Sequence, residues 1–384
     1  MGLIITPKQQ IDNYFDNEAV SQSRLKTLLG GLDSFLKDQE KSDKDLYYSE
    51  KSHFIKGSAV DIKLTGDEHD FENEYYISRL DTKPTDTEMS IAHRTFDYLI
   101  AEGVNPADMD TLVTYHGTLT QAVEDEKWYG GNPGEKRMAT LTQNINMYFT
   151  ELARSHGKQI ISLEEIDVID AVVDSFKTHS RTSKYFDREQ LSRNSSADVY
   201  LQLPIYFEYQ GVKCKALIDM LIVYKDDANN IVSVQPIDIK TMSGPTINFP
   251  FSMKNRRYDI QAAWYTLAIT EWLSYKNHVS DVVIMNFKFL VESTTQPGCP
   301  LEFVLDESLF MMGKQGRPEL VVNAAGVSDD FDTAHLHELR YNEVKGYETL
   351  FDDYVWYVLN GNLQEDRRIT DNGGIFRLDW NGIM

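Results

Sequence analysis

Hydrophobic residues recur along the chain with two different periods, and the change falls near residue 197. Before it, apolar residues are spaced three and four positions apart in VSQSRLKTLLGGLDSFL (20–36), TLTQNINMYFTELARSH (140–156) and SLEEIDVIDAVVDSFKTH (162–179). This spacing predicts amphipathic helices. In the first stretch, the pair Gly30-Gly31 predicts the end or a kink of the helix. The N-terminal half of the chain is therefore expected to be largely helical.

From residue 197 onward the period is two, which is typical of strands. Three such stretches follow one another: ADVYLQLPIYFEYQ (197–210), GVKCKALIDMLIVY (211–224) and IVSVQPIDIKT (231–241). Short polar turns join them, so they predict a three-stranded antiparallel meander. A helix, YDIQAAWYTLAITEWL (258–273), and one further strand, DVVIMNFKFLVE (281–292), are expected next.

This order of elements predicts an α/β or α+β fold with a mixed sheet, in which the meander is flanked by helices. A helix at about 334–359 and the tail GIFRLDWNGIM (374–384), interpreted as an edge strand, complete the prediction. Four segments result: 1–65 with N-terminal helices that contribute to the core, 66–190 with a mostly helical insertion, 195–300 with the sheet core, and 301–384 with the C-terminal helix and tail.

Charge and cysteine content narrow the functional classes. The formal net charge of −22 disfavours a protein that coats nucleic acid passively, because such binding needs basic surfaces. It is compatible with an enzyme whose acids collect around a metal ion. The two cysteines exclude a disulfide framework and a four-cysteine metal or iron–sulfur site. The sequence has neither the pattern of a signal peptide nor an apolar run of membrane-spanning length, so we expect a soluble cytoplasmic protein without a membrane partner.

Asp238 and Lys240 lie on one face of the predicted third strand, because strand side chains alternate. Counting outward from the turn near Ala228–Asn229 puts Asp219 opposite Asp238 or one residue away, with Cβ atoms about 5 Å apart. Two desolvated carboxylates this close repel each other, and a divalent cation relieves both penalties. An acid pair at a sheet edge, neutralised by nearby lysines, has the same pattern. These residues alone leave both interpretations open.

A basic stripe follows the third strand. Its members share one helical face if the next helix extends back to residue 254. They are Lys254, Arg257, Gln261 and Tyr265, with Arg256 as a neighbouring positive charge. Contacts to phosphate groups need such a stripe, although an ordinary solvated helix face also shows it.

The ordered set of motifs resembles the PD-(D/E)XK nuclease superfamily and, more narrowly, the RecB-type and RecE-like phage exonucleases. Those proteins have an acid on one strand, a (D/E)-x-K motif on the next and then a Gln-x-x-x-Tyr helix. The matching residues here are Asp219, Asp238-Ile239-Lys240, Gln261 and Tyr265. An N-terminal helix that opens with serines is matched by VSQSRLKTLL, and a Gly-x-Ala-x-His helix by residues 57–61, where Asp61 replaces the histidine. The resemblance covers about 20–65 and 195–295.

The resemblance implies a restriction-endonuclease-like core and a Mg²⁺- or Mn²⁺-dependent DNA exonuclease. Such an enzyme would act in phage recombination or DNA processing, digesting linear duplex ends from 5′ to 3′ in the host cytoplasm. The implied metal ligands are Asp61, Asp219, Asp238 and the backbone carbonyl of Ile239. The other implied catalytic residues are Lys240, serving the nucleophilic water, and Gln261 and Tyr265, positioning the cleaved strand or Lys240. The DNA-binding candidates are Ser21, Ser23, Arg24, Lys254, Arg256 and Arg257. A single-strand annealing protein and further copies of the chain are the other partners it suggests.

Other functional classes stay open at this point. A binding module could keep the nuclease fold without catalysis, although it would be expected to lose Lys240 or one of the two strand acids. A sequence-specific endonuclease of the superfamily would generally lack the Gln-x-x-x-Tyr helix, and a nuclease with a four-cysteine cluster would need more cysteines. A structural virion protein is opposed only by the motif set.

Overall fold

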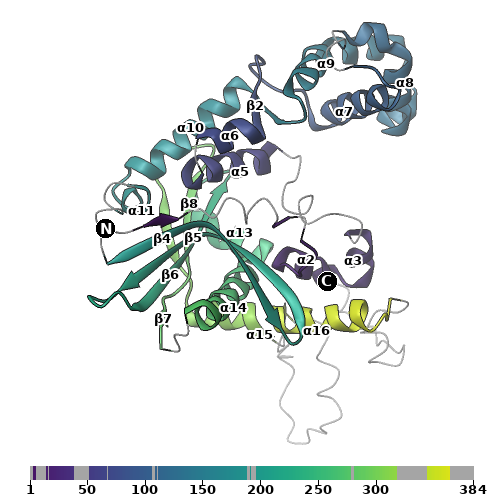
Figure 1. Ribbon diagram of the computed structural model, residues 1–384. Coiled ribbons are helices and arrows are strands. Elements are labelled where there is room, and N and C mark those ends of the chain that lie inside the picture. The colour runs from purple at the N-terminus through teal and green to yellow at the C-terminus, as the bar shows by residue number, and fades with distance from the viewer. Residues whose placement is uncertain are drawn as a thin grey trace, which may run out of the picture.

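A computed structural model describes residues 3–5, 14–15, 17–38, 52–66, 68–105, 109, 111–187, 191, 196–277, 281–317 and 344–363. The strands of its main sheet are β1 (Ile4–Ile5), β4 (Ala197–Tyr209), β5 (Val212–Lys225), β6 (Ile231–Met242), β7 (Val283–Ile284), β8 (Lys288–Ser293) and β9 (Leu301–Val304). They form one curled sheet in the order β1-β4-β5-β6-β8-β9, with β7 also paired to β6 (Figure 1). The sheet is mixed, as expected for an α+β fold.

Strands β4, β5 and β6 form the expected antiparallel meander. Leu201 pairs with Met220, and Met220 pairs with Ile237. The next residues in the second register are Asp219 and Asp238, so the two acids lie across from each other, as the counting predicted. Because the strands alternate apolar residues on both faces, both sides of the sheet can be covered by helices.

The prediction of a single strand over residues 281–292 is wrong. Two strands, β7 and β8, both run parallel to β6, and the chain between them leaves the ladder. There the side-chain amide of Gln235 donates to the carbonyl of Asn286 at 2.8 Å, where a backbone donor would otherwise bond. A side chain of β6 therefore substitutes for the missing backbone pairing.

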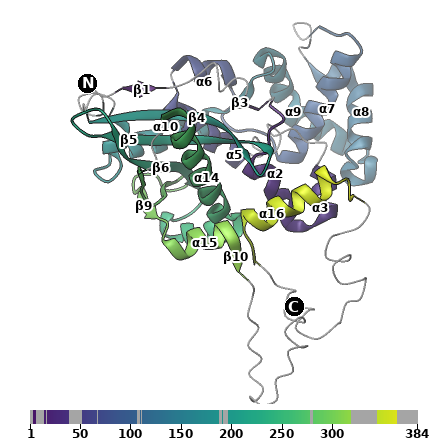
Figure 2. The same ribbon diagram turned by 60° about the horizontal axis from the view of Figure 1, so that its bottom comes forward.

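Helices cover both faces of the sheet (Figures 1 and 2). On one side lie α2 (Gln22–Lys26), α3 (Leu32–Asp38), α13 (Phe249–Arg256), α14 (Tyr258–Asn277), α15 (Glu307–Gln315) and α16 (Tyr347–Tyr354), which continues as a π-helix over Val355–Leu359. On the other side lie α5 (Ser52–Thr65), α6 (Glu68–Glu74), α10 (Leu163–Thr178) and α11 (Ser183–Phe186). Each side has its own cluster of buried apolar residues against the sheet.

Local sequence explains two of these helices. The predicted helix over 20–36 is interrupted at the glycine pair, because Gly31 has a φ of +81° that separates a 3-10 turn (Thr27–Gly30) from α3. Helix α10 begins at Ser162, whose hydroxyl accepts from the backbone of Glu165 while the Glu165 side chain accepts from Ser162 in return. This reciprocal cap explains the sharp start of the helix.

Residues 78–161 form an arm that projects from the sheet and contains a third apolar cluster (Figures 1 and 2). Its helices are α7 (Asp86–Ala101), α8 (His116–Asp125) and α9 (Glu135–Ser155). The chain enters and leaves the arm through two paired parallel strands, β2 (Tyr75–Ile77) and β3 (Gln159–Ile161). A further small pair is made by β10 (Gly316–Arg317) and β11 (Val344–Lys345) beside α15.

The C-terminal expectations are covered only in part. Helix α16 and its π-helical extension fall within the predicted 334–359, whereas residues 334–343 and the edge strand expected at 374–384 lie outside the described residues. Among the helices in the described ranges, none has the length and apolar content needed to cross a lipid bilayer.

Candidate active site

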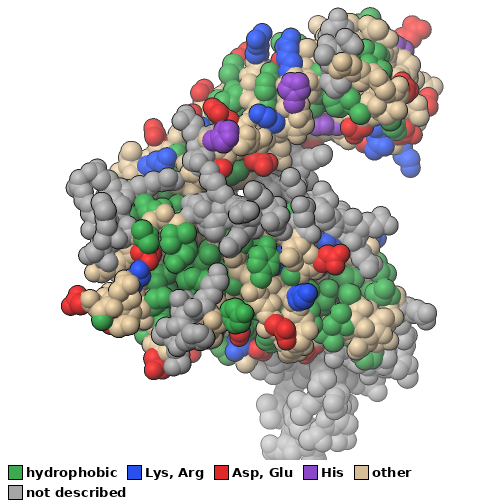
Figure 3. Space-filling model, in the orientation of Figure 1, with side chains coloured by type: hydrophobic (Ala, Val, Ile, Leu, Met, Phe, Trp, Pro, Cys, Tyr) green, Lys and Arg blue, Asp and Glu red, His purple; other side chains and the backbone are tan. Residues whose placement is uncertain are grey.

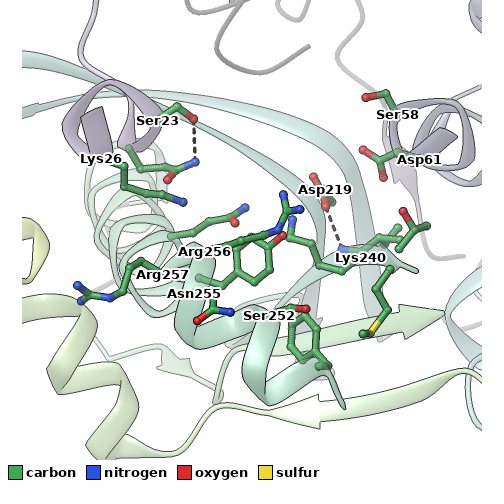
Figure 4. A pocket seen from close by; sticks show the side chains of 18 of the residues that line it. Ser23, Lys26, Ser58, Asp61, Asp219, Lys240, Ser252, Asn255, Arg256 and Arg257 are labelled. Atoms are coloured by element: carbon green, nitrogen blue, oxygen red, sulfur yellow. Dashed lines mark hydrogen bonds between the residues drawn. The ribbon is translucent and has the colours of Figure 1, made fainter. Parts of the chain in front are cut away.

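A cavity of about 540 Å³ lies between α2, α5 and α13, beside the C-terminal half of β6. Acidic residues line it from α5 and β5, and basic residues line it from α2 and α13 (Figure 4). The lining residues that matter most are Lys26, Asp61, Asp219, Lys240, Arg256 and Gln261. The cavity therefore joins an acidic wall to a basic one.

Asp61 belongs to the acidic wall and points into the cavity from α5 (Figure 4). Its Oδ2 accepts a hydrogen bond of 3.1 Å from the Gln202 side chain, while its buried Oδ1 has no hydrogen-bond partner among the described residues. Burial raises the pKa of Asp61 to about 7. The positive charge of Lys240 opposes this shift, and the negative charge of Asp238 adds to it. Helix α5 packs closely here, because a Cβ at Gly57 would lie 3.1 Å from the Thr241 hydroxyl.

The two strand acids are held by different donors. Asp219 accepts from the backbone N–H of Ile239 at 2.9 Å. Asp238, which is fully buried, accepts from the Gln261 amide at 2.7 Å, and its second oxygen lies 2.6 Å from Lys240 Nζ. Burial raises the pKa of Asp219 well above its ordinary range, and the nearby charges of Asp61 and Asp238 raise it further. Burial and mutual repulsion therefore destabilise the ionised forms of Asp61 and Asp219, both of which line the cavity.

Two lysines approach one tyrosine ring on the basic side. Lys240 Nζ lies 5.0 Å from the centre of the Tyr258 ring, and Lys26 Nζ lies 5.7 Å from it. Burial opposes the charge of Lys240, but attraction to Asp238 outweighs it and raises the pKa. Lys26 differs, because burial and the repulsion of Lys240 lower its pKa to about 8. Lys26 is thus a cation that an entering anion would stabilise.

Within the described ranges, no three His, Cys, Asp or Glu side chains are grouped closely enough to hold a metal ion as they stand. Each acid has its own hydrogen-bonding partner: Gln202 for Asp61, the Ile239 backbone for Asp219, and Gln261 with Lys240 for Asp238. Asp61 and Asp219 line one cavity, Asp238 is buried beside it, and the charges of the three acids act on one another.

The raised pKa of Asp61 gives a testable effect on stability. The folded state holds this proton up to pH of about 7, whereas the unfolded chain loses it near 3.8, so ionisation costs stability increasingly as pH rises between those values. In EDTA, Asp61→Asn is expected to raise the free energy of unfolding by about 1–3 kcal/mol at pH 8 and by little at pH 4.5. Urea denaturation at both pH values measures this. Asp226→Asn, in an exposed turn, should give no such gain, and an equal gain from Asp61→Asn at both pH values would contradict the explanation.

Several predicted residues do not line the cavity, and one of them is the fully buried Asp238. Tyr265 is buried in the core and lines a smaller, separate cavity with Ser21. The Ser21 hydroxyl accepts from the backbone of Arg24 and serves as the N-cap of α2, and Arg24 itself does not line the larger cavity. Only Ser23 of this group does.

The predicted stripe on one continuous helix is wrong. Arg257 has a φ of +50° and separates α13 from α14, so residues before and after it do not share a face. Its guanidinium binds Asp259 and the carbonyl of Lys345. Lys254 is exposed and does not line the cavity, whereas Arg256, Arg257 and Gln261 do. Part of the stripe reaches the cavity, but along two helices.

The sequence analysis missed Lys26 and Gln202. Lys26 follows Ser23 by three residues on α2, a spacing that puts both on one helical face and could have identified it. Gln202 has no comparable pattern, because it depends on a backbone conformation that its residue type does not predict.

Comparisons with known proteins add little. No protein-family model matches the chain, and no curated protein matches it. Among solved structures, the chain is matched to the crystal structure of a "Putative exonuclease" from Eubacterium rectale, with 12% identity, coverage of 87% of this chain and 93% of that chain, and a TM-score of 0.29. At that score the similarity carries no argument about fold or activity.

Proposed function

We propose that the protein is a metal-dependent DNA exonuclease of the PD-(D/E)XK type. The observation that supports it most is one cavity lined by Asp61, Asp219 and Lys240, whose opposite wall carries Lys26 and Arg256. The fully buried Asp238 is paired with Lys240 beside this cavity. The three acids come from α5, β5 and β6. A strand-face ion pair alone would need neither Asp61 nor the cavity.

The oxygen atoms at the acidic wall are suitable ligands for Mg²⁺ or Mn²⁺. Both ions prefer carboxylate oxygens, and Asp61 offers a buried Oδ1 without a hydrogen-bond partner among the described residues. Asp61, Asp219, Asp238 and the Ile239 carbonyl would hold the ion. When bound, such an ion polarises a phosphate and lowers the pKa of its water. Its charge would also relieve the repulsion that raises the pKa of Asp219.

The chain's own residues have separate parts in this proposal. Lys240 is held protonated beside Asp238, so it would orient the attacking water and stabilise developing negative charge rather than remove a proton. Gln261 fixes Asp238 through its amide. Lys26 and Arg256 would contact backbone phosphates, and Ser23 would add a hydroxyl donor.

A chain with a net charge of −22 needs a local group of basic residues to bind DNA. On the face drawn in Figure 3, described acidic and basic side chains are interspersed. The basic residues that line the cavity are Lys26, Lys240, Arg256 and Arg257. We therefore infer weak DNA affinity, because few phosphates would be contacted outside the cavity.

The finer parts of the proposal rest on the resemblance to RecE-like exonucleases. They are digestion from 5′ to 3′ at duplex ends, a role in phage recombination or DNA processing, cooperation with a single-strand annealing protein, and assembly with further copies of the chain. A non-catalytic binding module is the alternative. The alternative is less favoured because Asp61 points into the cavity that Asp219 and Lys240 also line.

Digestion of linear duplex, single-stranded and circular DNA with Mg²⁺, Mn²⁺ or EDTA tests the proposal. We expect metal-dependent loss of linear DNA, with circles spared, and at least about a hundredfold lower rate in Asp219→Asn. The matched control is Asp198→Asn, a buried strand aspartate that is paired with Lys225 and does not line the cavity. Wild type no faster than Asp219→Asn on every substrate would favour the binding module.

A further inference from the structure

Along β4, every second side chain points to one face of the sheet as far as Leu201 and to the opposite face from Leu203 onward. Val199 and Leu201 pack in the apolar cluster under α5 and α10. Leu203 and Ile205, which continue the same alternation, pack in the cluster on the opposite face with α14. In a regular strand, residues two apart share a face. The alternation is therefore reversed at the one residue between Leu201 and Leu203, which is Gln202.

The backbone of Gln202 accounts for the reversal. Its φ is +48°, in the left-handed region that a side chain disfavours. Other non-glycine residues with positive φ in the described ranges lie in turns, in a 3-10 segment or at helix ends, whereas Gln202 lies within a strand. Such a residue inside a ladder lets two consecutive side chains face the same way, as in a β-bulge.

The alternation of side chains is also reversed in the neighbouring strand β5, at the residue opposite Gln202. Ile218 of β5 packs with the α14 cluster and Met220 with the α5 cluster, although they too are two residues apart. They pair with Leu203 and Leu201, so the residue between them, Asp219, is opposite Gln202. The two reversals turn Asp219 toward the cavity and Gln202 toward α5.

Gln202 reaches a specific target there. Its amide donates to Asp61 Oδ2 at 3.1 Å and to the Thr65 hydroxyl at 3.2 Å, one helical turn further along α5. With Oδ2 engaged, the buried Oδ1 is the atom of Asp61 left for another ligand. A strained backbone conformation thus coincides with a contact to a candidate metal ligand, which is where such strain tends to be retained.

We propose that Gln202 is a positioning residue of the active site. Its left-handed backbone directs Asp219 and its own amide to the cavity side, and the amide fixes the carboxylate of Asp61 for a divalent cation. This inference rests on the proposed function. Gln202 would act through Asp61 and would not contact the substrate.

The test uses Mn²⁺ binding by the full chain, measured by isothermal titration calorimetry, together with thermal unfolding in EDTA. Gln202→Gly keeps the left-handed conformation accessible but removes the amide. It is expected to unfold close to the wild-type temperature and to bind Mn²⁺ about 10–100-fold more weakly, the usual effect of losing a residue that orients a metal ligand. Gln210→Gly is the matched control, because Gln210 also has a φ of +48° but lies in the exposed turn after β4. It should bind Mn²⁺ like the wild type.

A double variant keeps the test decisive even if Gln202→Gly is less stable. If Gln202 acts through Asp61, then Asp61→Asn with Gln202→Gly binds Mn²⁺ no more weakly than Asp61→Asn alone. Additive losses, or wild-type affinity in a folded Gln202→Gly, would overturn the positioning role while leaving the proposed function intact. Wild-type protein that neither binds Mn²⁺ nor cleaves DNA would overturn both.

Discussion

The Lys240→Met variant is expected to cleave linear DNA about a thousandfold more slowly than the wild-type chain at saturating Mg²⁺. Lys240 is the cation nearest the three acids, with its Nζ 2.6 Å from Asp238 and its pKa raised by that contact. Methionine preserves the length of the side chain but supplies neither a charge nor a donor for the water. Single-turnover cleavage of an end-labelled duplex measures the chemical step directly.

A lysine elsewhere in the same sheet provides the control. Lys225 forms a comparably buried ion pair with Asp198 at the far end of β5, away from the cavity. Lys225→Met should lose stability to a similar degree, because both substitutions leave a buried carboxylate unpaired, but it should retain the cleavage rate. If both variants lose activity equally, the loss reflects damaged folding, and the catalytic part assigned to Lys240 is wrong.

Trp264→Ala is expected to lower the free energy of unfolding by about 4 kcal/mol. Trp264 is fully buried at the centre of the cluster between the sheet and α14, with its ring centre 5.4 Å from that of Phe207 and 5.6 Å from that of Tyr347. Its indole N–H also donates to the carbonyl of Lys215 at 3.1 Å. The substitution would leave a cavity and remove that donor, and urea denaturation followed by far-UV circular dichroism would measure the loss.

Trp128 is the appropriate comparison, because it is only partly buried and belongs to the separate cluster of the arm. Trp128→Ala should cost clearly less than Trp264→Ala. Equal losses would mean that the α14 cluster is not the main source of stability of the sheet.

The meander and its paired acids could be predicted because they depend on local rules. Two-residue alternation fixes which residues share a strand face, and the short turn near Ala228–Asn229 fixes the register that brings Asp219 beside Asp238. The helix starting at Ser162 follows equally from its capping residues. In these places the information lies within a few residues of the feature.

The failures share one physical origin, which is backbone conformation that tertiary packing imposes on ordinary residues. Nothing in the residue types of Arg257 and Gln202 predicts a positive φ, yet one breaks the basic stripe and the other reverses the faces of β4. The strand predicted over 281–292 is likewise interrupted near Asn286, whose carbonyl accepts from the side chain of Gln235 in the neighbouring strand. Long-range contacts decide these positions, so single-sequence patterns do not reach them.

The arm has a consequence for how this protein can change during evolution. The side chains of its core all come from residues 76–160, so its packing does not depend on the sheet. The chain also leaves and returns at adjacent points, since the N–H of Ser78 donates to the carbonyl of Ile161 at 2.8 Å. Lengthening or shortening of the loops that join α7, α8 and α9 would leave α5, the sheet and the cavity in their present arrangement. Descendants could therefore acquire new recognition properties here while inheriting unaltered chemistry.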